Sequence, residues 1–183
     1  CSVCKGTADK TTIYAAKTVK LSTTKYTYNG KAKKPSVVIK TSKGKTVSSK
    51  YYTVTYASGR KNIGKYKVTV KLGGNYSGSK TLYFTIVPKT VSGLKLSSPA
   101  KKQLSIKWTK DSKVGGYQIV YATNSKFTKG KKTITVKSYK TYKQTVKSLK
   151  SKGTYYVKAR AFKKVSGTTY YGAYCATKKL KIK

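Results

Sequence analysis

Apolar and polar residues alternate along most of this chain of 183 residues. The clearest example is residues 66–72, where Tyr, Val, Val and Leu alternate with Lys, Thr and Lys. Strict alternation with a period of two is typical of a β-strand that buries one face. No segment of useful length shows the 3.6-residue period of a helix. The pattern therefore predicts an all-β protein.

Two series of short strands stand on either side of a linker at residues 87–93. Before it we predict strands at residues 15–21, 36–40, 52–56, 66–72 and 81–87. After it we predict strands at residues 94–96, 103–108, 117–122, 132–136, 144–146, 155–162 and 170–182. Pairs such as Asn29-Gly30 supply the positive φ that hairpin turns need. Strands repeating at intervals of roughly ten residues indicate β-sandwiches. We expect a tail at 1–13 and two tandem antiparallel sandwiches at 14–88 and 89–183.

The second half contains a motif that marks a fold. Leu149 precedes Tyr155 by six positions, and Trp108 ends the run Leu-Ser-Ile-Lys-Trp. These residues resemble the E–F corner and the B-strand tryptophan of a fibronectin type III domain. The resemblance implies that the Tyr155 hydroxyl closes the corner. Trp108, Leu149 and Tyr155 would then mark the fold and carry no function.

The first half resembles a different family. The matching motifs are Tyr-Thr-Tyr-Asn-Gly-Lys at 26–31, Tyr-Thr-Val-Thr-Tyr at 52–56, Asn-Ile-Gly at 62–64 and Gly-Asn-Tyr-Ser-Gly at 74–78. They are similar to bacterial Ig-like repeats of secreted and surface proteins from Gram-positive gut anaerobes. The resemblance implies an extracellular, cell-surface or wall-associated modular protein, whose domains act as spacers, adhesion modules or appendages to enzymes. Around residues 58–61, where such repeats often hold acids or Asn, this chain frequently has Lys and Arg.

Composition adds an extreme positive charge, because 43 Lys and Arg face two acids and the formal net charge is +41. Arg60 and Arg160 are the only Arg residues, and the other cations are Lys. High net charge is often a sign of disorder, but 37% hydrophobic residues in an alternating pattern predict a folded protein. Lys is a compact, strongly hydrated point charge. A lysine coat therefore predicts attraction to anionic polymers by counterion release, without base specificity.

Lysine density is highest in runs at residues 31–34, 126–132, 147–152 and 178–183. A charge run is usually a solvated face, but here almost no counter-charge exists in the chain. We predict polyanion binding at Lys31, Lys33, Lys34, Lys129, Lys131, Lys132, Lys147, Lys150, Lys152, Lys178 and Lys179. Expected partners are nucleic acid, sulfated glycans or teichoic acid, with an anionic membrane surface as a further candidate.

The sequence offers little for catalysis or for a cofactor. Acid–base chemistry usually needs His or two carboxylates at one site, whereas the chain has no His. Its two acids, Asp9 and Asp111, fall in the predicted tail and in the second domain. Cys1 and Cys4 form a CxxC, but a structural zinc site takes four Cys or His ligands and the chain has three Cys. We therefore predict no enzyme activity, no cofactor and no metal.

The three cysteines are disulfide candidates. Cys175 can pair with Cys1 or with Cys4, which leaves one thiol free or available to link two chains. A bridge between Cys1 and Cys4 is the other pairing, and spacing does not decide between them.

These observations predict an extracellular, non-catalytic adhesion module that binds anionic polymers through a cationic surface. The alternative is a structural spacer or a wall-associated subunit that self-associates through disulfides or into filaments. A secreted cationic effector is less favoured because no amphipathic helix is present.

Overall fold

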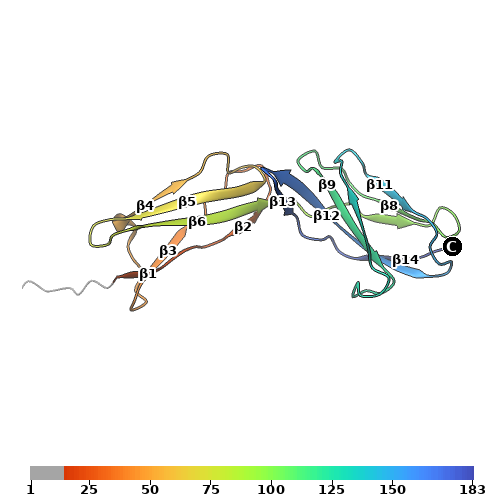
Figure 1. Cartoon of the computed structure of the whole chain (residues 1–183), viewed down its shortest axis with the longest axis horizontal. Coiled ribbons are helices and arrows are strands. Elements are labelled where there is room, and N and C mark those ends of the chain that lie inside the picture. The colour runs from red at the N-terminus through yellow and green to blue at the C-terminus, as the bar shows by residue number, and fades with distance from the viewer. Residues whose placement is uncertain (1–14) are drawn as a thin grey trace, which may run out of the picture. The chain divides into compact units, whose positions relative to one another are not determined.

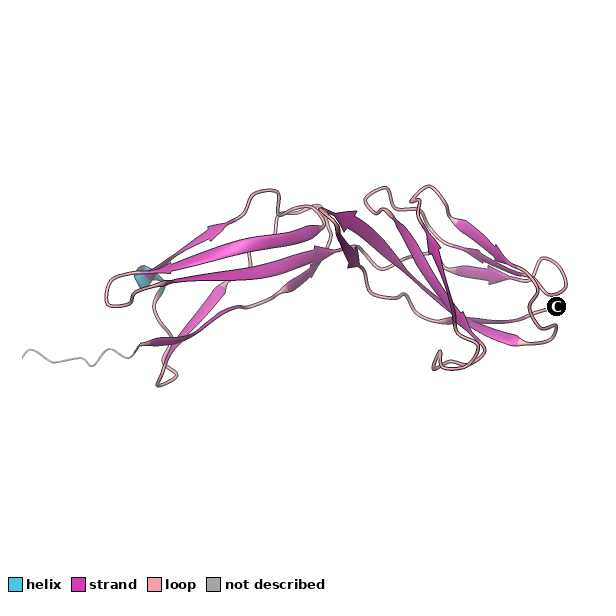
Figure 2. Cartoon of the chain, in the orientation of Figure 1, coloured by secondary structure: helices cyan, strands magenta, loops and turns pink. Residues whose placement is uncertain are grey.

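The computed structural model describes residues 15–183. Apart from one short 3₁₀ helix, η1 (Ser49–Tyr51), every regular element in this range is a β-strand (Figure 2). The prediction of an all-β chain is confirmed. Within the same range, no helix is long and apolar enough to span a membrane.

The strands of the first half form two sheets (Figure 1). One sheet pairs β1 (Ala16–Leu21) with β3 (Val37–Thr41) in antiparallel register. The other has the order β2-β6-β5-β4. Its strands are β2 (Lys25–Thr27), β4 (Tyr52–Tyr56), β5 (Gly64–Leu72) and β6 (Ser79–Val87). Ile39 on β3 and Val70 on β5 are fully buried members of a common core.

Strand β2 departs from the expected antiparallel arrangement. It runs parallel to β6, with Lys25 opposite Thr85 and Thr27 opposite Val87. Its three residues place one half-buried side chain, Tyr26, between two exposed ones. Such a short segment is too brief for alternation to predict, so the strand is absent from the sequence-based expectation.

The strands of the second half form two further sheets. A three-stranded sheet has the order β11-β8-β7, with β7 (Lys95–Ser97), β8 (Leu104–Lys107) and β11 (Lys143–Val146). A five-stranded sheet has the order β10-β9-β12-β13, and β14 also pairs with β12. Its strands are β9 (Gly116–Ala122), β10 (Lys132–Val136), β12 (Thr154–Val165), β13 (Thr168–Tyr171) and β14 (Lys178–Lys181).

The single strand expected at residues 170–182 is two strands in the structure. β13 pairs with the end of β12, where Phe162 lies opposite Tyr171, and β14 pairs with the start of β12. Between them, the N–H groups of Gly172 and Cys175 donate to the carbonyls of Ala161 and Ala159. The chain therefore stays beside β12 but loses the regular register that alternation predicted.

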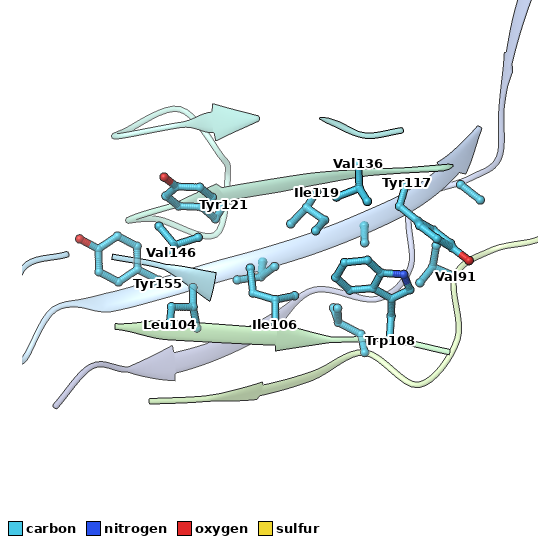
Figure 3. Packing of buried hydrophobic residues seen from close by; sticks show 14 of the residues in the cluster. Val91, Leu104, Ile106, Trp108, Tyr117, Ile119, Tyr121, Val136, Val146 and Tyr155 are labelled. Atoms are coloured by element: carbon cyan, nitrogen blue, oxygen red, sulfur yellow. The ribbon is translucent and has the colours of Figure 1, made fainter. Parts of the chain in front are cut away.

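Side chains from both sheets of the second half meet in one core (Figure 3). Leu104 and Ile106 of β8 are fully buried, as is Ile119 of β9. Trp108 follows β8, and its ring lies 5.3 Å from that of Tyr117, centroid to centroid. Two sheets packed across a shared apolar interior make a β-sandwich, which confirms the predicted fold class.

The chain divides into two compact units. One unit contains residues 15–24 together with Lys34–Ser58 and Tyr66–Phe84. The other contains Lys25–Lys33, Gly59–Lys65 and Thr85–Lys183. The contiguous domains expected at 14–88 and 89–183 stay predictions.

Candidate anion-binding surface

The lysines that density predicted belong to four segments of the chain. Ten of the eleven are exposed, and Lys33 is half-buried. Lys31, Lys33 and Lys34 lie between β2 and β3. The others lie in the β9–β10 connection and the start of β10 (Lys129, Lys131, Lys132), between β11 and β12 (Lys147, Lys150, Lys152), and at the start of β14 (Lys178, Lys179).

Two of these lysines have partners that partly satisfy their charge. The Lys33 ammonium donates a 2.6 Å hydrogen bond to the Asn29 side-chain oxygen and lies 5.7 Å from the centroid of the Tyr26 ring. The Lys34 ammonium lies at the same distance from the Tyr56 ring. A ring face attracts a cation at such distances, so these two lysines are less free to bind a polymer than their exposure suggests.

The register of the three-stranded sheet brings together three lysines that sequence density did not single out. Lys107 of β8 lies directly opposite Lys143 of β11 on one side and Lys95 of β7 on the other. We call these residues the lysine row. Strand alternation places the row on the outer face, because Ile106 points into the core. All three lysines are exposed.

The lysine row is crowded and has no compensating partner in residues 15–183. Directly opposite residues on neighbouring strands have Cβ atoms about 4.5–5.5 Å apart, and like charges in such positions are destabilising. The three ammonium groups have no hydrogen bond, ion pair or ring contact with another residue of the described range. The sheet therefore holds three adjacent positive charges that the folded chain itself leaves unsatisfied.

A second row on the same face consists of hydroxyl groups. Ser105 of β8 lies opposite Thr145 of β11 and Ser97 of β7. We call these the hydroxyl row. Ser105 is only 2% exposed, and its Oγ is buried without a hydrogen-bond partner among the described residues. A buried hydroxyl without a partner costs about 1–3 kcal/mol, so this atom is a polar group that the described chain leaves unpartnered.

The outer face of the five-stranded sheet arranges its cations differently. On β12, Val157 and Ala159 are buried, whereas the alternate residues Lys158 and Arg160 lie on the outer face. The Lys158 ammonium is 4.0 Å from the Phe127 ring centroid and 4.8 Å from that of Tyr174. The Arg160 guanidinium is 3.9 Å from the Tyr171 centroid and 4.6 Å from that of Tyr174. We call these five residues the cation–ring ladder.

A side-chain amide completes the ladder. The Gln118 oxygen accepts a 2.8 Å hydrogen bond from Arg160 Nε and a 3.0 Å bond from the Tyr174 hydroxyl. Gln118 lies opposite Arg160 in the β9–β12 register. Both cations of the ladder thus have ring partners, and the guanidinium also has a neutral acceptor.

Asp111 is the one acid in residues 15–183. Its carboxylate accepts a 2.8 Å hydrogen bond from the backbone N–H of Lys113, and its own N–H donates to the Tyr117 hydroxyl at 2.7 Å. These two hydrogen bonds make Asp111 a turn residue, and the described range contains no cluster of three metal-ligating side chains.

Two buried tyrosines of the same core have perturbed pKa values. Burial raises the pKa of Tyr117, and burial together with the neighbouring Tyr155 raises the pKa of Tyr121.

The corner residues and the cysteines complete the predicted sites. Leu149 and Tyr155 are buried in the core of the second half, and the Lys150 N–H donates to the Tyr155 hydroxyl at 3.2 Å. The Cys175 thiol is half-buried, has no disulfide partner within residues 15–183, and accepts a hydrogen bond from the Ala159 N–H at 3.3 Å. Its proposed partners, Cys1 and Cys4, lie outside the described residues, as does Asp9.

Comparison with known proteins identifies the fold but no family. No family model matches the chain, and no curated protein matches its sequence at a significant level. A two-domain fibronectin type III segment from chicken tenascin superposes with a TM-score of 0.56 and 15% identity, covering 91% of this chain and 98% of that chain. The fold is fibronectin type III-like. The FN5 domain of Drosophila Lar covers 52% of this chain and 97% of its own, with 18% identity and a TM-score of 0.43.

Proposed function

We propose that this protein is an extracellular, non-catalytic adhesion module that binds anionic polymers electrostatically. The lysine row carries the proposal, because it holds three exposed charges together on one sheet without any partner in the described chain. A fold of this kind hosts many functions, so the proposal rests on the charged side chains of the surface and not on the fold.

Charge balance explains why a polymer would bind. With Asp111 as the one acid in residues 15–183, most cations of the folded chain are neutralised by solvent ions. A polyanion that takes their place releases those ions, as well as its own condensed counterions, and gains entropy. Nucleic acid, sulfated glycans and teichoic acid all supply such chains, and an anionic membrane surface offers a similar field.

Location follows from the resemblance of the first half to bacterial Ig-like repeats. Together with the fibronectin type III-like fold, it supports a secreted or wall-associated protein of a Gram-positive bacterium. In that setting the charge would retain the protein on wall polymers or on the anionic glycans of a host surface. Arg60 and Lys61 stand where such repeats often hold acids or Asn, and their positive charges suit the same role.

The test is binding of the full chain to heparin, duplex DNA and neutral dextran across a range of salt concentrations. We expect steep salt-dependent binding to both anions and none to dextran, with a log–log slope of about −0.9 for each DNA phosphate neutralised. Failure to bind either anion at physiological ionic strength would contradict the proposal and favour a spacer role.

A further inference from the structure

We propose that the lysine row and the adjoining hydroxyl row form a binding site for a sulfated polysaccharide, whose sulfate groups lie across strands β7, β8 and β11. This inference rests on the function proposed above and assigns it to one face of the molecule. It differs from the sites that lysine density predicted, because none of Lys95, Lys107 and Lys143 belongs to a dense run.

The first argument is geometric. Neighbouring strands lie about 4.7–4.9 Å apart, so three lysines in register span about 10 Å across the sheet. Their stems start from a rigid hydrogen-bonded ladder, which fixes the spacing between them. A chain that carries closely spaced anionic groups can contact all three at once, whereas a single small anion cannot.

The second argument is that the free protein gains nothing from this arrangement. Like charges directly opposite each other repel. An anionic group placed over the lysine row would relieve this repulsion by neutralising the ammonium groups, and the exposed Ser97 hydroxyl beside the row can donate a hydrogen bond to it. The lysines and the exposed hydroxyl of this face therefore suit the same kind of ligand.

The third argument selects a polysaccharide over a nucleic acid. The six side chains of the two rows include no aromatic ring, so the rows themselves give bases no ring to stack on. They also include no Arg, which is the side chain best suited to bidentate guanine contacts. Lysines beside exposed hydroxyls suit sulfate groups together with sugar hydroxyls.

The experiment compares two triple variants of the full chain. One replaces the lysine row (K95Q, K107Q and K143Q). The control removes the same charge from exposed strand lysines that each face an uncharged residue (K20Q, K40Q and K71Q). Affinity for a heparin fragment, the same fragment after chemical desulfation, and duplex DNA is measured by calorimetry across salt concentrations. Circular dichroism verifies that both variants fold.

We expect the row variant to lose roughly tenfold in heparin affinity at physiological ionic strength, since three exposed ion pairs disappear. The control should lose less than about threefold in heparin affinity, because it lowers the total positive charge but removes no lysine of the row. Desulfated heparin should bind weakly to every variant. The S97A variant should lose about twofold in heparin affinity, because the exposed hydroxyl beside the lysines is removed. The S105A variant should keep its heparin affinity while becoming more resistant to unfolding, because its hydroxyl is buried without a partner.

Four results would overturn this inference. Equal losses in the row variant and the control would show that binding is spread over the whole surface, which leaves the proposed function intact. A larger loss for DNA than for heparin in the row variant would make the occupant a nucleic acid. Unchanged heparin affinity in S97A would remove the hydroxyl row from the site. No binding of the unmodified chain to heparin or DNA would refute the proposed function as well.

Discussion

The cation–ring ladder and the lysine row, which lie on the two outer faces of the second sandwich, present cations in opposite ways. On the five-stranded sheet, Lys158 and Arg160 lie among three aromatic rings, and Gln118 accepts a hydrogen bond from the guanidinium. On the three-stranded sheet, no aromatic ring or side-chain amide of the described residues contacts an ammonium group of the lysine row. Both faces belong to one fold and share its core, so the difference lies in the side chains.

This difference shows how a chain almost without acids can satisfy a positive charge. Carboxylates are nearly absent, so the available partners are ring faces, amide oxygens and backbone carbonyls. The cation–ring ladder uses the first two and thereby stabilises the folded state. Cations that lack such partners stay available to an external anion. The contrast therefore separates charges that support the fold from charges that we propose bind an anionic polymer.

The largest expected effect is on stability at Arg160. Replacing it by Ala removes the hydrogen bond to Gln118 and the contacts with the Tyr171 and Tyr174 rings. Hydrogen bonds to charged groups contribute about 1.5–3 kcal/mol, and the half-buried position argues for the lower part of that range. We expect the free energy of unfolding in urea to fall by about 2 kcal/mol.

The control for this prediction is R160K. It keeps the charge but loses the planar fork, so part of the stability should be lost. Heparin affinity should change little in R160A compared with the lysine-row variant. If R160A loses much of its heparin affinity but keeps its stability, Arg160 belongs to the binding surface and does not support the fold.

A smaller effect is expected at Gln118. In Q118L the Arg160 Nε and the Tyr174 hydroxyl lose their common acceptor, which should lower the free energy of unfolding by about 1 kcal/mol. Q118E keeps an acceptor and adds a negative charge beside Arg160. It should be at least as stable as the unmodified chain at low salt. Equal stability of Q118L and the unmodified chain would show that the amide does not support the ladder.

Much of this architecture could be predicted from the sequence, because alternation reveals which residues of a strand face the core. The strands that contain Ile106 and Val70 were predicted in this way. Register could not be predicted, since pairing depends on which strands become neighbours in space. Lys95, Lys107 and Lys143 are therefore separate lysines in the sequence and neighbours in the sheet. The break after Tyr171 was missed for the same reason: two strands that share β12 look continuous in sequence.

The smallest effect tests the lysine row in the free protein. In K107T the central charge is replaced by a side chain that favours strands, so Lys95 and Lys143 no longer face a like charge. The free energy of unfolding should rise by about 0.5 kcal/mol at low salt. The gain should disappear at about 1 M salt, where the Debye length is only about 3 Å. K20T is the matched control, because Lys20 lies opposite Val38 and gains the same propensity without relieving a cross-strand repulsion. Urea unfolding at both salt concentrations separates the two contributions. If K107T loses stability at low salt relative to K20T, the row is compensated within the folded chain, and the contrast between the two faces does not hold.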